Sequence, residues 1–157
     1  VPGRTAGLAS WKYGATTVIA LIHDVLIPAG FFAAAGHFFG FEVDTLFVTA
    51  ILTILGFSVH DTIVVFDRIH ENLKTGAPYA DFGALVNGSV SQTFVRSVNT
   101  SLTVALALAA VYAFGGATTR IFSLTLLIGV LVGTYSSIFI ASPLLVTWQQ
   151  WQNKAKS

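Results

Sequence analysis

The 157-residue chain is 54% hydrophobic and only 10% charged, with a mean hydropathy of +0.76. Soluble domains carry about 25% charged residues, so this composition excludes an ordinary water-soluble protein and favours a membrane protein. The formal net charge of +1 provides no basic field for nucleic acid, and the lack of Cys excludes disulfides and thiolate metal sites.

Long apolar runs predict an all-α, polytopic membrane bundle with four helices. A spanning helix needs roughly 20 mainly apolar residues, and strands are disfavoured because the runs are long and do not alternate. The four runs lie at about 13–39, 44–66, 94–114 and 121–148. We expect a single transmembrane domain over 1–157, with the more polar stretch 67–93 as a cytoplasmic loop that contains short helical or amphipathic pieces.

The basic residues predict how the spans are oriented. One side of the spans carries Arg4, Lys12, Arg68, Lys74, Lys154 and Lys156. The other side carries only Arg120, together with Glu42 and Asp44. Because cytoplasmic loops are enriched in Lys and Arg, both termini and the loop at 67–93 are expected in the cytoplasm. The chain begins with Val1, contains no Met and shows no signal-peptide pattern, so we expect a segment of a longer protein.

The first two spans each contain a buried acid. Asp24, with His23 beside it, falls near the middle of the first span and needs a polar partner on another helix. Asp61 lies in the second span, where an ionised carboxylate costs about 3 kcal/mol or more. Both acids are candidates for a proton pathway, and a role in helix packing is the alternative. His60 is interpreted as locally structural.

The third span offers a cation for Asp61. Arg96 enters from the same side of the membrane, and Thr100 follows at helical spacing, with Ser101 next to it. A carboxylate that faces an arginine and hydroxyl groups can load and unload a proton. A static ion pair that locks two helices explains the same spacing, so both interpretations stay open at this point.

The fourth span contains small residues at every fourth position. Gly129, Gly133 and Ser137 are followed by Ala141 at the same spacing. Such a face lets another helix backbone approach closely, so these residues are expected to pack a helix. Enzyme motifs are missing, including HExxH, GxSG, GxGD and phosphate loops, and the four His residues do not form a metal site. We expect no enzyme, no cofactor and no metal.

Three stretches resemble the bacterial SecF family. These are LTILGFSVHDTIVVFDRIHENL, VNGSVSQTFVRSVNTSLT and FSLTLLIGVLVGTYSSIFIASPLL, in the family's order and spacing. The resemblance runs from about Trp11 to Trp148. It implies the last four helices of a six-helix half of the RND superfamily, either as SecF or as the SecF half of a fused SecDF.

The resemblance also implies a function. Such proteins assist Sec-dependent protein translocation and are driven by the proton motive force, with Asp61 as the proton carrier and Arg96 as its partner. The implied partners are SecD, the SecYEG translocon, YajC and an unfolded preprotein held by a periplasmic domain. The implied location is the bacterial inner membrane, among lipids and without nucleic acid. An RND-type, proton-coupled exporter of small molecules or lipids is the alternative.

Overall fold

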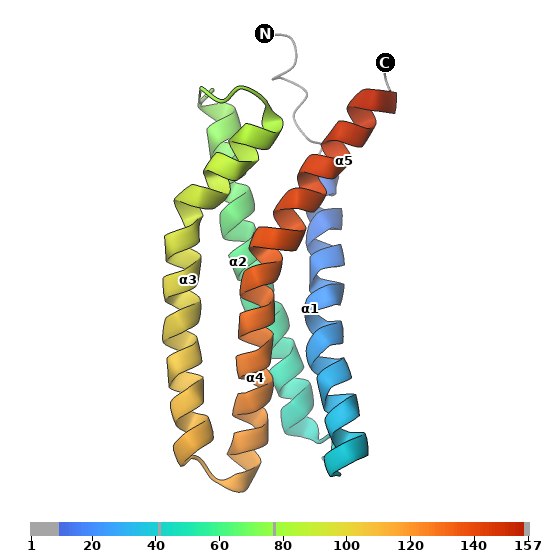
Figure 1. Cartoon of the computed structure of the whole chain (residues 1–157), viewed down its shortest axis with the longest axis vertical. Coiled ribbons are helices and arrows are strands. Elements are labelled where there is room, and N and C mark those ends of the chain that lie inside the picture. Colours follow the sequence, from blue (N-terminus) through green and yellow to red (C-terminus); the bar gives the residue numbers. More distant parts are fainter. Residues whose placement is uncertain (1–9, 41, 77, 156–157) are drawn as a thin grey trace.

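The computed structural model describes residues 10–40, 42–76 and 78–155, which form an antiparallel bundle of helices (Figure 1). In chain order they are α1 (Ser10–Phe39), α2 (Thr45–Lys74), α3 (Phe82–Phe114), α4 (Ala117–Ser136), the π-helix η1 (Ser137–Ala141) and α5 (Ser142–Ala155). The described part contains no strand. Four helical segments are long and apolar enough to cross a membrane, which confirms the predicted fold class.

The helices are arranged around a central pair. α2 and α4 pack along the middle, and α1 and α3 lie on opposite sides of this pair (Figure 1). The start of α1, the end of α5 and the α2–α3 connection share one end of the bundle, while the α1–α2 and α3–α4 connections share the other. The α1–α4 face and the α2–α3 face therefore lie on opposite sides of the bundle.

The polar stretch 67–93 is mostly helical, which corrects the loop predicted there. α2 continues to Lys74, and α3 already begins at Phe82, where the Asp81 carboxylate accepts a hydrogen bond of 2.7 Å from the Ala84 N–H. An acidic side chain at this position satisfies an N–H group that has no partner inside the helix. Gly76, with φ of +64°, provides the left-handed turn that ends α2.

The fourth span is not one continuous α-helix. Five residues of π-helix separate α4 from α5, and the Ser142 hydroxyl donates to the carbonyl of Ser137 at 3.1 Å. Pro143 has no N–H to offer the carbonyl of Phe139, so the regular hydrogen-bond pattern cannot continue through this turn. Single π-helical turns of this kind often occur at functional sites.

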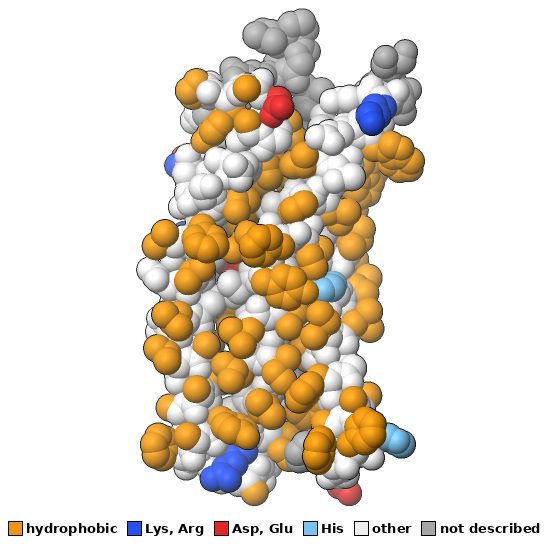
Figure 2. Space-filling model, in the orientation of Figure 1, with side chains coloured by type: hydrophobic (Ala, Val, Ile, Leu, Met, Phe, Trp, Pro, Cys, Tyr) orange, Lys and Arg blue, Asp and Glu red, His pale blue; other side chains and the backbone are white. Residues whose placement is uncertain are grey.

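Buried residues along α2 change from apolar to polar and back. Ala50 and Ile54 belong to one apolar cluster, and Val65 and Ile69 belong to another. The buried residues between them are polar: Ser58, Asp61 and Thr62. Figure 2 shows apolar side chains along the whole length of the bundle, with most charged surface towards its two ends. A polar layer thus crosses the middle of a bundle whose face in Figure 2 is largely apolar.

Candidate functional site

Asp61 lies at the centre of this polar layer. Its side chain comes from the middle of α2, and the residue is only 7% exposed. The Ser97 hydroxyl on α3 donates to Oδ1 at 2.7 Å, and the Ser137 hydroxyl in η1 donates to Oδ2 at 2.5 Å. Each carboxylate oxygen therefore has a hydroxyl donor from a different helix, which offsets part of the cost of burying it.

The expected ion pair between Asp61 and Arg96 is not formed. The ion pairs within 4.0 Å in the described ranges are His23–Asp24 and Arg68–Glu71. The buried stripe of α3 runs through Thr93, Ser97 and Ser101, and one residue turns a helix by about 100°. Arg96 precedes Ser97 and is therefore rotated onto the exposed surface of α3.

Arg96 nevertheless borders the same cavity as Asp61. This cavity has a volume of about 160 Å³ and is lined by Phe57, His60, Asp61, Val64, Arg96, Ser97 and Thr100. A buried cavity needs only about 10–15 Å³ for the centre of one water molecule, so there is room for several. His60 and Thr100 are exposed on the α2–α3 face, beside the cavity. Arg96 and Asp61 thus border one space that water can fill.

Asp24 is fully buried and has the partner on another helix that its position requires. The Ser58 hydroxyl on α2 donates to its Oδ2, and Nδ1 of His23 lies 3.0 Å from its Oδ1. Ser58 precedes Asp61 by one turn on the same buried face of α2. The two acids therefore belong to one polar layer, although no direct contact joins them in the described residues.

Ser101 joins the layer from α3. Its hydroxyl lies 2.5 Å from the Thr134 hydroxyl on α4, which in turn donates to the carbonyl of Val130 at 2.7 Å. The Ser137 hydroxyl also approaches the Thr134 carbonyl at 3.0 Å. Every helix of the bundle core thus contributes at least one polar side chain at this depth.

Gly129 and Gly133 bring α4 close to α2. A Cβ atom at Gly129 would lie 2.2 Å from Ile54, and one at Gly133 would lie 3.3 Å from Cβ of Ser58. Ser137, four residues beyond Gly133, reaches Asp61. Because neither glycine has a side chain, α4 lies close enough to α2 for the Ser137 hydroxyl in η1 to bind Asp61.

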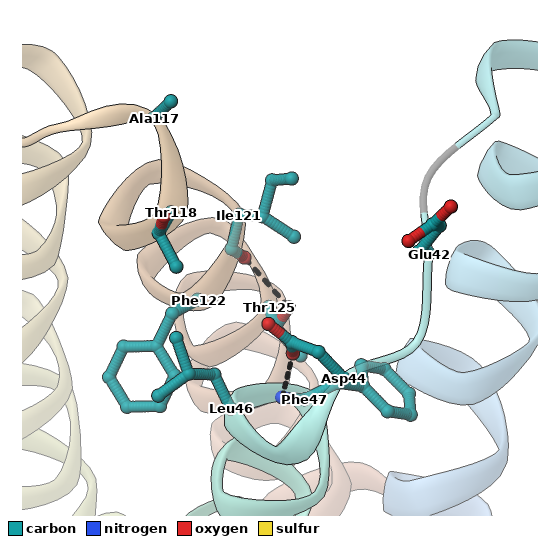
Figure 3. Close-up of a pocket in the computed structure, with 9 residues that line it drawn as sticks. All are labelled: Glu42, Asp44, Leu46, Phe47, Ala117, Thr118, Ile121, Phe122 and Thr125. Carbon is teal, nitrogen blue, oxygen red and sulfur yellow. Dashed lines mark hydrogen bonds between the residues drawn. The ribbon is translucent and has the colours of Figure 1, made fainter.

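A separate pocket lies at the end of the bundle opposite to the start of α1 and the end of α5. It has a volume of about 280 Å³ and is formed where the start of α2 meets the start of α4 (Figure 3). Its Asp44 carboxylate already accepts the Phe47 N–H at 2.9 Å and caps α2. None of its lining residues contacts Asp61, and no group of three metal-ligating side chains occurs in the described ranges.

Sequence reasoning missed the hydroxyl groups that hold the acids. It placed Ser137 on a packing face and did not single out Ser58 or Ser97 as partners. One signal was available: Ser89, Thr93, Ser97 and Ser101 recur every four residues in α3, which marks a polar face one residue away from Arg96.

Known proteins match the chain over nearly its whole length. The model of the family described as "Protein export membrane protein SecD/SecF, C-terminal" matches residues 9–151. A protein translocase subunit SecF of Thermobaculum terrenum is 58% identical over 139 residues, which are 88% of this chain and 44% of that protein. A SecF of Synechocystis is 46% identical over 90% of this chain and 44% of that protein. The chain thus spans less than half the length of these relatives.

Solved structures agree with the sequence matches. The crystal structure of SecDF from Thermus thermophilus superposes with a TM-score of 0.82 and 41% identity, covering 90% of this chain and 19% of that one. A super-membrane-facing form of SecDF gives a TM-score of 0.81 at 40% identity, over 94% of this chain and 20% of that one. The chain therefore belongs to the SecD/SecF family of protein-export membrane proteins, and it corresponds to the C-terminal membrane part of SecF.

Proposed function

We propose that this chain is the membrane part of a SecF-type subunit that assists protein translocation and is driven by the proton motive force. The family assignment supports the role in translocation, because the matching relatives are named protein translocase subunits. The observation that carries the proton step is the buried Asp61 carboxylate, held by Ser97 and Ser137 in the middle of a membrane bundle.

The two serines suit an acid that changes its protonation state. When Asp61 is ionised, both hydroxyls donate to it, as in the arrangement described. When it is protonated, its O–H donates to one serine, whose hydroxyl rotates to donate elsewhere, because a hydroxyl is both donor and acceptor. Both states keep their hydrogen bonds, so a proton can come and go without leaving a buried polar group unsatisfied.

Arg96 supplies a positive charge that can balance Asp61 once the acid has released its proton. Its guanidinium is always protonated and borders the cavity next to Asp61. In the proposed cycle the arginine swings toward Asp61 when the acid releases its proton and withdraws when the acid is neutral. Thr100, on the cavity wall, and Ser101, hydrogen-bonded to Thr134, extend the path on α3. Asp24 belongs to the same path through Ser58.

The α2–α3 face suits a partner chain better than lipid. Four polar side chains are exposed on it near the middle of the helices: His60, Arg96, Asn99 and Thr100. A charged group that faces hydrocarbon is costly, and covering the face with protein or enclosed water removes this cost. In the proposed assembly SecD covers this face, either as a separate chain or as the other half of a fused SecDF. SecYEG, YajC and the preprotein are its further partners.

The proposed location is the bacterial inner membrane, with both chain ends in the cytoplasm. Lys12, Arg68, Lys74 and Lys154 belong to the helix ends at which α1 starts and α5 finishes (Figure 1). Arg120, near the start of α4, belongs to the other end. This asymmetry follows the enrichment of Lys and Arg on the cytoplasmic side.

The test compares Asp61→Asn with Asp44→Asn in the full-length protein together with SecD, reconstituted in vesicles. Asp44→Asn is the matched control, since Asn caps a helix as well as Asp does. The proposal predicts that Asp61→Asn lowers proton flux and preprotein export by more than about tenfold, because the essential proton carrier is lost. Wild-type flux and export in Asp61→Asn would overturn it.

A further inference from the structure

A chain of hydrogen bonds leads from the second buried acid, Asp24, to the surface of the bundle. Nδ1 of His23 lies 3.0 Å from Oδ1 of Asp24, and its Nε2 lies 2.8 Å from the Tyr135 hydroxyl on α4. The Ser58 hydroxyl donates to the other oxygen of Asp24. The carboxylate is fully buried, whereas Tyr135 is 39% exposed and the His23 side chain is 29% exposed.

This series of hydrogen bonds reaches the surface on the face of the bundle opposite to Arg96. His23 and Tyr135 meet between α1 and α4, with their rings edge to face at 5.6 Å. Arg96 lies on α3, on the far side of the α2–α4 pair. Figure 2 shows histidine surface among apolar side chains about halfway along the bundle, on the side of α1. Ionisable side chains at this depth in a membrane are costly, and they usually face protein or enclosed water and take part in function.

When Asp24 is ionised, its hydrogen bond determines the tautomer of His23. An ionised Asp24 only accepts, so Nδ1 of His23 carries the hydrogen and Nε2 accepts from the Tyr135 O–H. A proton that binds to Nε2 gives an imidazolium beside Asp24, while the tyrosine hydroxyl turns to accept. The Nδ1 proton can then move to Oδ1 of Asp24. This leaves a neutral carboxylic acid and an imidazole with hydrogen on Nε2, and the pair has gained one proton.

Among the described residues, no Lys or Arg competes with His23 for Asp24. In the described ranges no Lys or Arg lies within 4.0 Å of Asp24, and His23 is its only ionic neighbour there. The group on α2 that contacts Asp24 is Ser58, and Asp61 lies one turn further along α2. The group on α4 that contacts His23 is Tyr135. The charge of an added proton is therefore shared between the imidazole and the carboxylate.

We propose that His23 and Asp24 form a proton-binding site of their own, which opens between α1 and α4 through the Tyr135 hydroxyl. Ser58 places this site beside Asp61. The bundle then holds two proton positions, one on the Arg96 side and one on the opposite side. The role of the second site in transport rests on the proposed function, whereas its hydrogen-bond arrangement does not.

The arrangement is tested by nitrogen NMR of histidine in the full-length protein with SecD in lipid nanodiscs. The signal of His23 is assigned by its loss in His23→Gln. The proposal predicts that the neutral ring carries hydrogen on Nδ1 when Asp24 is ionised. In Tyr135→Phe, Nε2 loses its hydrogen-bond donor, so the Nε2 signal should shift. At high pH, where Asp24 is ionised, hydrogen on Nε2 of the neutral ring would overturn the proposal, whatever the flux measurements give. At lower pH the proton-loaded pair is expected to carry hydrogen on Nε2, so a ring that keeps its hydrogen on Nδ1 throughout the titration would also overturn it.

The role is tested by proton flux in vesicles. His23→Gln and Asp24→Asn should lower flux by more than about tenfold, and Tyr135→Phe by about two- to fivefold, since proton relays contribute factors of this size. Tyr112→Phe is the control, because Tyr112 is a half-exposed tyrosine of α3 away from this site. Added imidazole should restore flux several-fold in His23→Ala, which a mere packing role does not explain.

The outcomes separate this inference from the proposed function. If Asp61→Asn stops flux while His23→Gln and Asp24→Asn run at the wild-type rate, the second site is refuted and Asp24 drops out of the proposed path. The proposed function then stands on Asp61 and its partners alone. If Asp61→Asn leaves flux unchanged, the proposed function fails, and the NMR result alone decides whether the second site exists. Thermal unfolding and co-purification with SecD identify any variant that fails to fold.

Discussion

Replacing Gly129 with Ala tests the packing that brings α4 to Asp61. The added Cβ would lie 2.2 Å from both Cδ1 and Cγ1 of Ile54 and 2.9 Å from its Cγ2. Ile54 is 1% exposed and branches at Cβ, so it cannot rotate all three atoms away. The helices must separate, and overpacking of this kind costs about 1–3 kcal/mol.

A matched control removes the effect of helix propensity. Gly56 lies on α2, and a Cβ there would meet nothing within 4 Å. Both substitutions gain the same helix propensity of about 1 kcal/mol, so the difference between Gly129→Ala and Gly56→Ala reports the clash alone. We expect that difference to be about 1–3 kcal/mol in the free energy of unfolding, measured by denaturant titration in mixed micelles.

A double variant identifies the partner of the clash. Ile54→Ala alone leaves a cavity and costs about 2–5 kcal/mol. Combined with Gly129→Ala, it makes room for the new methyl group. The double variant should therefore lose about 1–3 kcal/mol less stability than the sum of the two single losses. Additive losses, or a Gly129→Ala variant as stable as Gly56→Ala, would show that α4 does not approach α2 as described.

Three further predictions concern the polar groups and the topology. Ser97→Ala should lower proton flux several-fold, because the carboxylate of Asp61 loses one of its two hydroxyl donors. Asn72→Ala should lower the free energy of unfolding by about 1–3 kcal/mol, because it removes a buried hydrogen bond from α2 to Ser89 on α3. The chain has no Cys, so single cysteines report sidedness: Arg120→Cys should react with an impermeant thiol reagent from the periplasm, and Lys154→Cys only from the cytoplasm.

Two exposed residues of α3 serve as controls for Ser97 and Asn72. Ser91 donates only to the carbonyl of Asn87, one turn earlier, so Ser91→Ala should leave flux unchanged. Asn87 is itself exposed, and Asn87→Ala should cost little stability. Equal effects at Ser91 and Ser97, or at Asn87 and Asn72, would contradict the assignments. Labelling of both cysteines from one side would contradict the topology.

The overall fold could be predicted from the sequence because apolar run length determines spans in a membrane. The helix ends were harder: α3 begins at Phe82, because Asp81 caps it, well before the apolar part of the helix starts. The polar residues of 82–93 still form a helix, since the end of a helix can extend beyond the hydrocarbon. Hydrophobicity therefore predicts the part of the helix inside the membrane and not its full length.

The sequence singled out the two buried acids and not the hydroxyl groups that they contact. Asp61 and Asp24 stood out because a carboxylate within a membrane-spanning apolar run is costly and therefore rare. The choice of Arg96 as the contact of Asp61 was wrong for this conformation, because one residue along α3 decides between the buried face and the surface. The π-helix that positions Ser137 depends on a local change of hydrogen bonding near Pro143, which periodicity does not reveal.

The most direct test of the central claim is infrared difference spectroscopy of the full-length protein with SecD, recorded as the pH is stepped across the membrane. If Asp61 binds and releases a proton during transport, the wild type shows a carboxylic-acid band that is missing in Asp61→Asn and kept in Asp44→Asn. Identical spectra of the wild type and Asp61→Asn would contradict the account.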